Sequence, residues 1–539
     1  MSIDPAGFHL AAHALATPDK TALVMAGSGE VRTYREIDDA SVRLACLLRD
    51  RGMKTGDHLA VLVENQPEFF DAVWAAMRAG LYVTPINWHL APAEAGYIIR
   101  DCDATALVAT ARLAKVIAAL DPADLANTTT RISVDSSGIL TGVGERESDR
   151  TPASDPLAIH GFRPLDEVLA DSQLGPVPQE HEGGWMFYSS GTTGRPKGIV
   201  PPLAGAPLGA PSFLTAMLTG MFGFSSETIY LSPAPLYHAS PAGWTTGTQR
   251  LGGTVVVMER FDPIDLLAAV ERYQITHMQL VPTHMIRLLK LPAADRKRFD
   301  LSSLQVVVHA AAPCPVDVKR AFIDWVGPIV HEYYSGSEGS GFCYIGPEDW
   351  LAHPGSVGKS MTGAAHILGP DGDELPIGEE GEIWFETTRV FEYHHDPEKT
   401  RSVFNDQGWS WLGDVGRIDD EGYLYLTDRA SHMIISGGVN IYPREAEDIL
   451  VQHPAVADVA VLGVPDEEMG ERVVAFIQLA EGSATLPHGA IRADDAGAAE
   501  LIAWCRDRLS HFKCPTQVRF VDDLPRLPTG KLLKRLLIP

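Results

Sequence analysis

The sequence has few cysteines and no long hydrophobic run. Only six of its 539 residues are cysteine, and none of them form a CxxC pair or a spacing typical of zinc ligands, so we expect buried free thiols. No apolar run reaches the roughly 18 to 20 residues that span a bilayer. The first basic residue is Lys20, which argues against a secretory signal. We therefore expect a cytoplasmic protein without a membrane span.

Basic residues are also scarce. Lys and Arg total 44 against 70 Asp and Glu, which gives a net charge of −26. This charge disfavours general binding to a nucleic-acid backbone or to an anionic membrane. Any anionic ligand must therefore meet a local site. The composition, 45% hydrophobic and 21% charged, is that of a folded globular protein and excludes a disordered or coiled-coil chain.

The chain changes its pattern twice. Short apolar runs alternate with helical patterns up to about residue 335, which predicts parallel α/β layers. Expected strands include 59–63, 254–258 and 305–308, and a helix over 263–273 is expected to cross between the last two. Short strands from about 365 predict a small β layer. A compact α+β unit follows, so we expect a large N-terminal domain over 1–430 and a small C-terminal domain over 431–539.

The most informative segment runs from Tyr188 to Gly198. Its glycines permit tight turns, and its hydroxyls and Lys197 can donate to phosphate oxygens. It does not fit the GxxxxGK[ST] pattern, because Lys197 follows a proline and precedes a glycine, which excludes a simple P-loop NTPase. The alternative to an anion-binding loop is a flexible surface loop.

This segment resembles the signature loop of the adenylate-forming superfamily, which comprises acyl- and aryl-CoA synthetases, adenylation domains of peptide synthetases, and luciferases. The resemblance covers nearly the whole chain, and further motifs follow in the family's order at 330–338, 411–416, 429–443 and 524–531. It implies an acyl-CoA synthetase-like α/β fold with a mobile C-terminal α+β domain. It also implies ATP, Mg²⁺ and coenzyme A as cofactors.

The resemblance assigns roles to individual residues. Tyr334 is implied to stack on adenine, Ser337 to meet the α-phosphate and Glu338 to bind Mg²⁺. Asp414 is implied to accept hydrogen bonds from the ribose hydroxyls, with Arg429 beside it. The other nucleotide-binding residues that it implies are Ser189, Ser190, Gly191, Thr192, Thr193, Gly194, Lys197, Ala311, Glu332 and Tyr333, with Thr193 as a further candidate ligand of Mg²⁺.

The C-terminal motifs resemble the junction and the mobile lysine of the family. Ser431 occupies the hinge position, where Asp or Lys is usual, and Gly437 and Gly438 are implied to line the tunnel for the pantetheine arm of coenzyme A. A β-turn is the alternative interpretation of the two glycines. Lys531 is implied to be catalytic, because its point charge can reach both the carboxylate and the α-phosphate. A solvated lysine near the end of the chain is the alternative.

The implied reaction has two steps. A carboxylate attacks the α-phosphorus of ATP, giving an acyl adenylate and pyrophosphate, and the small domain then rotates so that a thiol can attack the adenylate. His238 lies in a segment that resembles the aromatic-His motif of acyl-CoA synthetases, where it is implied to be catalytic; a packed core histidine is the alternative. Peptide synthetases place an Asp there, so His238 argues against an amino-acid substrate.

We therefore predict an AMP-forming carboxylic acid:CoA ligase for a medium-chain, branched, alicyclic or steroid side-chain acid. Apolar candidates for the acyl pocket are Pro241, Trp244, Met285, Met217 and Phe222, although a hydrophobic core would look the same. Two alternatives remain, namely a ligase that transfers the adenylate to a carrier-protein thiol and a catalytically silent nucleotide-binding regulator. A homodimer is suggested by the family alone.

Overall fold

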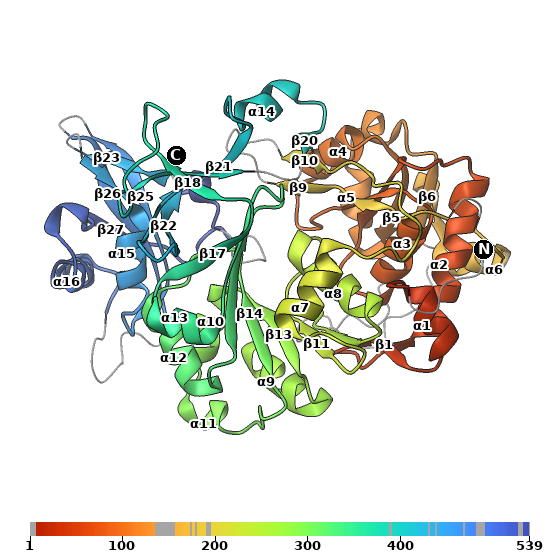
Figure 1. The fold of residues 1–539 in the computed structure, drawn as a ribbon, viewed down its shortest axis with the longest axis horizontal. Helices are drawn as coiled ribbons and strands as arrows, with labels where there is room; N and C mark the ends of the chain where they lie inside the picture. The colour runs from red at the N-terminus through yellow and green to blue at the C-terminus, as the bar shows by residue number, and fades with distance from the viewer. Residues whose placement is uncertain are drawn as a thin grey trace.

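The structure is a computed structural model (Figure 1) that describes residues 7–134, 157–172, 175–177, 180–189, 196–386, 391–429, 432–436, 439–466, 469–480, 491–526 and 532–537. Parallel and antiparallel sheets, helices on their faces and a separate C-terminal unit make up the α/β fold that the sequence predicts. Among the described residues, no helix is both long and apolar enough to cross a bilayer.

A six-stranded parallel sheet forms the N-terminal part of the molecule. Its order is β7 (Arg163–Pro164), β6 (Thr130–Val134), β5 (Ala104–Thr110), β3 (His58–Leu62), β4 (Tyr82–Pro85) and β8 (Gly184–Trp185). The helices of this part are α1 (Leu10–Ala16), α2 (Tyr34–Asp50), α3 (Pro67–Arg78), α4 (Pro92–Asp101), α5 (Ala114–Ala118) and α6 (Leu165–Asp171).

A thirteen-stranded sheet joins the second α/β layer to the small β layer. Its parallel section contains β15 (Val330–Ser335), β14 (Val306–His309), β13 (His277–Leu280), β11 (Ile229–Ser232), β12 (Thr254–Val257) and β1 (Thr21–Met25), with β2 (Val31–Thr33) antiparallel at the end. Its antiparallel section contains β16 (Phe342–Ile345), β17 (Ser356–Thr362), β22 (Leu424–Arg429), β21 (Trp409–Ile418), β19 (Gly381–Glu386) and β18 (Ala365–Leu368). The expected β layer is thus continuous with the parallel strands.

The helices associated with this sheet are α7 (Phe213–Phe222), α8 (Ala239–Arg250), α9 (Pro263–Tyr273), α10 (Pro282–Leu289), α11 (Ala293–Arg296), α12 (Val316–Val326), α13 (Pro347–Ala352) and α14 (Pro397–Ser402). A third, small sheet has the order β20 (Glu392–Tyr393), β10 (Lys197–Val200) and β9 (Phe187–Ser189). It lies between the two large layers in Figure 1.

The C-terminal unit has a sheet of its own. Its strands are β24 (Val439–Ile441), β23 (Ile434–Ser436), β26 (Gly470–Leu479), β25 (Val456–Asp466) and β27 (Gln517–Phe520), and its helices are α15 (Pro443–Leu450) and α16 (Asp495–Arg506). Figure 1 shows this unit beside β17, β22 and α12 of the larger part. Its apolar interior is a separate cluster.

The main core lies between the two large sheets. Every residue of α3 except Glu68 is buried, which fits a helix covered on all sides. One hydrophobic cluster joins α3 to Leu59 and Val61 of β3 and to Leu23 and Val255 of the thirteen-stranded sheet. The two layers are therefore packed into one body.

The expected crossover over 263–273 forms as α9, with Pro263 at its first turn. It leads from β12 to β13, not directly to β14 as expected. The missed strand has the sequence His277-Met278-Gln279-Leu280. It is short and contains two buried polar side chains, so it lacks a clear apolar signal.

Candidate active site

A β-hairpin carries the ends of the predicted phosphate loop. Ser189 ends β9, Lys197 begins β10, and the two residues face each other in the antiparallel pair. The predicted residues between them, Ser190, Gly191, Thr192, Thr193 and Gly194, lie outside the described residues. The pairing brings the two ends of the loop together.

Lys197 shares a polar network with the predicted magnesium ligand. Its ammonium lies 5.5 Å from the centre of the Tyr393 ring, and the Tyr393 hydroxyl donates a 3.0 Å hydrogen bond to Glu338 Oε1. Burial and the neighbouring Lys399 lower the pKa of Lys197, while Asp396 and Glu338 act in the opposite direction. A phosphate group near Lys197 would favour its charged form, because opposite charges attract more strongly where water is partly excluded.

A second network surrounds Asp414. The Tyr334 hydroxyl donates a 2.6 Å hydrogen bond to Asp414 Oδ2, and Arg429 Nε lies 3.0 Å from Asp414 Oδ1. Asp414 and Arg429 face each other on β21 and β22, so the sheet register itself places them together. Asp414, with a smaller contribution from Glu338, raises the pKa of Arg429 against the effect of burial. The two networks are therefore electrostatically linked.

The turn after β15 approaches β21 closely at Gly336. A Cβ atom added there would lie 2.3 Å from Leu412 Cδ1 and 2.9 Å from Glu338 Oε2, so the ends of both side chains would have to shift. A side chain at this position would therefore disturb the Glu338 carboxylate. Ser337 follows on the same turn and is exposed, while Glu338 is half-buried. This close approach places Glu338 at the edge where the two networks meet.

Glu332 lies deeper than the residues around it. Its Oε2 atom accepts a 2.6 Å hydrogen bond from Lys319 Nζ and lies 3.2 Å from His309 Nε2, and all three residues are buried. Burial alone would raise the pKa of Glu332, but His309 and Lys319 lower it to about 2. Lys319 also lies 4.7 Å from the centre of the Trp350 ring. These contacts make a buried charged cluster on the strand that also carries Tyr333 and Tyr334.

Ser335 and Ala311 each have a distinctive local structure. The Ser335 hydroxyl donates a 2.6 Å hydrogen bond to the backbone carbonyl of Gly341, which fixes the end of β15 to the turn that follows. Ala311 has a φ of 72°, a left-handed conformation that favours glycine. An alanine there stores local strain, on the order of 1 kcal/mol, in the exposed turn after β14.

His238 lies directly before α8, close to a hydrogen-bonded trio. Its ring centre is 4.3 Å from that of Tyr237. Two residues further on, Ser240 Oγ lies 2.6 Å from the Tyr333 hydroxyl and donates a 2.8 Å hydrogen bond to Gln279 Oε1. Gln279 Nε2 in turn donates to the Tyr333 hydroxyl over 2.9 Å. The first turn of α8 is therefore fixed to β15, next to Tyr334.

The predicted acyl-pocket residues are all buried, namely Pro241, Trp244, Met217, Phe222 and Met285. Trp244 stacks on Tyr333 with ring centres 5.9 Å apart, and Tyr333 stacks on Phe342 at 5.5 Å. Met217 and Phe222 belong to the same hydrophobic cluster as Trp244. Met285 packs into a different cluster, so the structure does not bring it together with the others.

The predicted residues of the hinge, the tunnel and the mobile lysine lie outside the described residues, like the centre of the phosphate loop. They are Ser431, Gly437, Gly438 and Lys531. Conversely, sequence patterns missed Tyr393 and Gln279, which contact Glu338 and Tyr333. Neither residue belongs to a recognised motif, since each lies on a short strand of only two to four residues.

The described residues provide the donor and acceptor types that a nucleotide requires. Asp414 is an acceptor for hydroxyl groups, Lys197 is a cation for phosphate oxygens, and Glu338 is a hard oxygen ligand for a divalent ion. Tyr333 and Tyr334 are neighbours on β15, so their side chains point to opposite faces of the strand. One faces the stacked aromatic rings, and the other faces Asp414. The strand thus separates an apolar side from a polar side.

Comparisons with known proteins agree with this arrangement. The family model for AMP-binding enzymes matches residues 10–393, and that for the AMP-binding enzyme C-terminal domain matches residues 445–531. The chain is 33% identical to a feruloyl-CoA synthase from an Amycolatopsis species over 94% of this chain and 93% of the relative. It is also 33% identical to a propanoyl:CoA ligase for a methyl-dioxo-octahydroindenyl acid from Rhodococcus jostii, over 96% and 95% of the two chains.

The solved structure of ATP-bound MatB from Rhodopseudomonas palustris is similar throughout, with a TM-score of 0.78, 27% identity and 98% of both chains covered. These matches confirm the predicted superfamily, fold class and type of reaction. The chain belongs to the AMP-binding enzyme family and is an ATP-dependent, AMP-forming acid–thiol ligase of the acyl-CoA synthetase type.

Proposed function

We propose that this enzyme joins a medium-chain, branched, alicyclic or steroid side-chain acid to coenzyme A. The observation that carries the proposal is the pair of faces on β15, where Tyr333 stacks with Trp244 and Phe342 while Tyr334 donates to Asp414. An apolar acyl group fits the aromatic side, and a nucleotide fits the polar side.

Each polar residue then has a role in the first step. We assign Glu338 to Mg²⁺, which when bound neutralises charge on the phosphate oxygens. Lys197 offers its ammonium to the phosphates, and Asp414 accepts from the ribose hydroxyls while Arg429 holds its carboxylate in place. The carboxylate of the acid attacks the α-phosphorus, and pyrophosphate leaves. Lys531 is assigned to offset the charge that develops on the transferring group.

The second step requires a different arrangement. We assign Ser431 as the hinge about which the small domain rotates, withdrawing Lys531 and bringing Gly437 and Gly438 to the site. The thiol of coenzyme A then attacks the mixed anhydride, and AMP leaves. His238, at the start of α8, is placed between the acyl side and this thiol in the proposal. Catalysis by this route requires no protein nucleophile.

Two relatives support a ring-bearing acid. One is named for a feruloyl group and the other for a bicyclic propanoyl group. The stacked rings around Tyr333 provide the flat apolar surfaces that such groups pack against. The hydrogen-bonded trio of Ser240, Gln279 and Tyr333 adds a polar point within this region. We therefore expect ring acids to be preferred over linear acids of equal size.

A substrate panel tests the proposal. Pyrophosphate release is measured with ATP and Mg²⁺ for fatty, aryl, alicyclic, steroid side-chain and amino acids, each with and without coenzyme A. Slow release with one ring acid, accelerated by coenzyme A, is the expected result. Release that does not respond to coenzyme A would instead favour transfer to a carrier-protein thiol. The absence of release with every acid would favour a silent regulator.

Substitution of Lys531 separates the two steps. We expect Lys531→Ala to reduce adenylate formation by at least about 100-fold, because the charge that stabilises the transition state is lost. Thioester formation from a supplied acyl adenylate should be largely retained. Lys534→Ala is a matched control, since Lys534 lies three residues further on and is paired with Glu447 at 2.8 Å. Equal loss of both steps in Lys531→Ala would contradict the two-conformation proposal.

We also propose a cytoplasmic location and a homodimeric assembly. All six cysteines are free thiols, as a reducing compartment such as the cytoplasm maintains. The assembly we propose is a homodimer, supported by the resemblance to the superfamily alone. Light scattering of the purified enzyme tests the assembly, and a monomeric mass would exclude it.

A further inference from the structure

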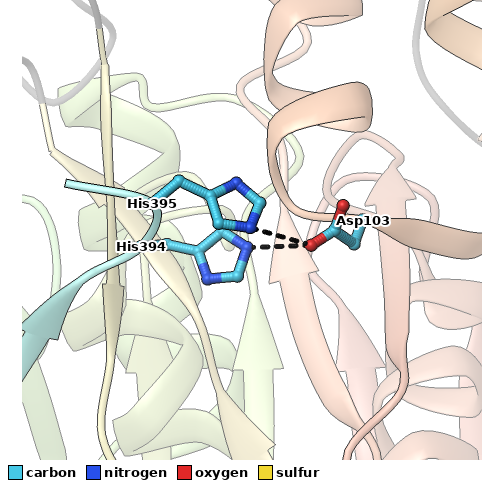
Figure 2. Close-up of side chains that lie close together, drawn as sticks. All are labelled: Asp103, His394 and His395. Carbon is cyan, nitrogen blue, oxygen red and sulfur yellow. Dashed lines mark hydrogen bonds and ion pairs between the residues drawn. The ribbon is translucent and has the colours of Figure 1, made fainter.

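Two histidines and one aspartate converge at a place that the ligase reaction does not use. His394 Nε2 lies 3.2 Å and His395 Nε2 lies 3.3 Å from the same oxygen, Asp103 Oδ2. The three ligand atoms all lie within 4.8 Å of one another. Figure 2 shows both imidazoles facing the carboxylate from one side, with Asp103 on the opposite side near the helical corner of the N-terminal layer.

These spacings match those of a metal site. Zinc binds imidazole nitrogen and carboxylate oxygen at about 2.1 Å, so two ligands of a tetrahedral ion lie about 3.4 Å apart. Both distances to Asp103 are already close to this value. Imidazole with carboxylate is also a donor set that suits Zn²⁺ and neighbouring divalent transition metals. Small rotations of the two rings would complete a three-ligand face with one or more positions open to water.

The backbone produces this convergence. Consecutive residues of an extended strand direct their side chains to opposite faces. His395 has a φ of 54°, which ends the extended conformation, and its ring lies 3.8 Å from that of His394, centre to centre. Asp103 has a φ of 52° and is also left-handed. These are two of the four non-glycine residues with positive φ in the described part of the chain. Such conformations persist where the surroundings enforce them, and they concentrate at functional sites.

A further imidazole stands beside the cluster. The ring of His58 lies 5.7 Å from that of His394 and stacks on Tyr82 at 4.8 Å. His58 is buried, and its Nδ1 atom has no hydrogen-bond partner within the described residues. A third imidazole with an unsatisfied ring nitrogen therefore lies beside the cluster.

We propose that Asp103, His394 and His395 form a binding site for one divalent transition-metal ion of the Zn²⁺ type, separate from the nucleotide site. The assignment rests on side chains whose proximity is independent of the ligase reaction. It therefore does not depend on the identity of the acid substrate.

The location gives the site a structural consequence. His394 directly follows Tyr393, whose hydroxyl donates to Glu338, and the His394 amide donates to the carbonyl of Gly198 on β10. Two residues before Asp103, Asp101 accepts a 2.7 Å hydrogen bond from Tyr188 on β9. A metal ion would therefore fasten the β20 edge of the phosphate-loop sheet to the corner between α4 and β5. The Tyr188 hydrogen bond already ties the β9 edge to the same corner.

Calorimetric titration tests the site. Full-length enzyme without an affinity tag is treated with EDTA, exchanged into metal-free buffer and titrated with ZnCl₂ and, separately, with CoCl₂. One ion per chain with micromolar affinity is expected, and cobalt should give the visible absorption of a low-symmetry, nitrogen-ligated ion. Asp103→Asn and His395→Asn should each weaken binding by at least about tenfold. Asparagine tolerates the left-handed backbone at both positions, so the fold should be kept.

Two control variants locate the ion. His366→Ala is matched, because His366 also contacts two carboxylates, Glu374 at 2.9 Å and Glu386 at 3.3 Å, but through opposite ring nitrogens that cannot hold one ion. It should bind Zn²⁺ like the unaltered enzyme. Glu338→Gln should do so as well. Loss of binding in Glu338→Gln, or unchanged binding in both Asp103→Asn and His395→Asn, would overturn the proposal, as would the absence of saturable binding.

Hydrogen exchange provides a readout that does not depend on catalysis. Zn²⁺ should slow amide exchange in β10 and β20 by at least about threefold in the unaltered enzyme, because the sheet is held at one more point. The effect should disappear in His395→Asn. Slowing that persists in this variant would show that the ion acts elsewhere.

Discussion

A buried carboxyl group on α3 should make stability depend on pH. Asp71 is 3% exposed and lies near Glu68 and Arg32. Burial, and next the charge of Glu68, raise the pKa of Asp71 to about 8, and burial raises that of Glu68 to about 7. Folding therefore favours the protonated forms. The stability that the protonated Asp71 carboxyl group contributes is fully present below its unfolded pKa near 4. It is lost as the pH rises through about 8.

Replacement by an amide should remove this loss. We expect Asp71→Asn to be more stable than the unaltered enzyme at about pH 9, by an amount on the order of 2 kcal/mol, and to show a flatter decline between about pH 4 and pH 8. Thermal unfolding from about pH 4 to about pH 9 measures both effects. Asp166→Asn is the control, because Asp166 influences Asp71 but is itself exposed. A parallel pH profile for Asp71→Asn and the unaltered enzyme would refute the argument.

At the residue level, motifs predicted which side chains form the site better than they predicted which residues those side chains contact. The structure brings together Tyr334, Asp414 and Arg429, which the family resemblance had assigned to one nucleoside. It also places Glu332 in an ion cluster with Lys319, a partner that no sequence pattern indicates. Contacts of this kind depend on which strands are neighbours, and a side chain such as Tyr393 acquires its role only through that neighbourhood.

The hairpin of β9 and β10 is closely packed at Gly198. An added Cβ atom would lie 2.3 Å from Met186 Cε and 2.9 Å from Tyr188 Cζ. We expect Gly198→Ala to displace β10 and with it Lys197, which precedes it. Adenylate formation should fall by at least about tenfold, and stability should fall by about 1–3 kcal/mol. Pyrophosphate release and thermal unfolding measure the two effects.

Gly220→Ala serves as the control for this hairpin variant. Gly220 lies on α7, where an added Cβ atom meets nothing within 4 Å. Alanine in a helix interior should leave activity unchanged and raise stability by up to about 1 kcal/mol. Full activity of Gly198→Ala would show that the position of β10 is not critical for the phosphate site.

At the level of elements, hydrophobic periodicity and end signals predicted a helix but missed a strand. The helix over 263–273 was predictable because proline begins it and apolar residues recur at helical spacing. The strand at His277 was not, since two of its four residues are buried polar side chains. Their hydrogen-bond partners, the Phe222 carbonyl and the Tyr333 hydroxyl, come near them only in the folded protein. The continuity of the β layer with the parallel strands likewise depends on pairing between β16 and β17.

At the scale of the whole molecule, the C-terminal unit docks on α10. Lys290, at the end of this helix, donates to the carbonyls of Val456 at 2.6 Å and Ala457 at 3.4 Å, and Ile286 packs against the apolar cluster of the C-terminal unit. Arg444, on α15 of the C-terminal unit, donates to the carbonyl of Leu426 on β22 of the larger part at 2.8 Å. No sequence pattern identifies the Lys290 and Arg444 contacts, because both side chains donate to backbone carbonyls, which every residue carries.

Loss of the Lys290 contacts should shift the arrangement of the two units. A hydrogen bond from a charged donor contributes about 1.5–3 kcal/mol, and 1.4 kcal/mol is tenfold in an equilibrium, so Lys290→Ala should reduce the docked population by at least about tenfold relative to other arrangements. Small-angle scattering should report a larger radius of gyration. Lys297→Ala, which removes an exposed lysine from the same region, is the control.

The kinetic consequence of this shift distinguishes domain rotation from simple loosening. If each half-reaction uses its own arrangement of the two units, the docked arrangement can serve only one of them. Lys290→Ala should then change adenylate formation and thioester formation in opposite directions, because the residues around Asp414 and Glu338 are untouched. Single-turnover measurements of both half-reactions give the two rates. A fall of equal size in both would mean that the contact only stabilises the fold, and the rotation about Ser431 would lose its support.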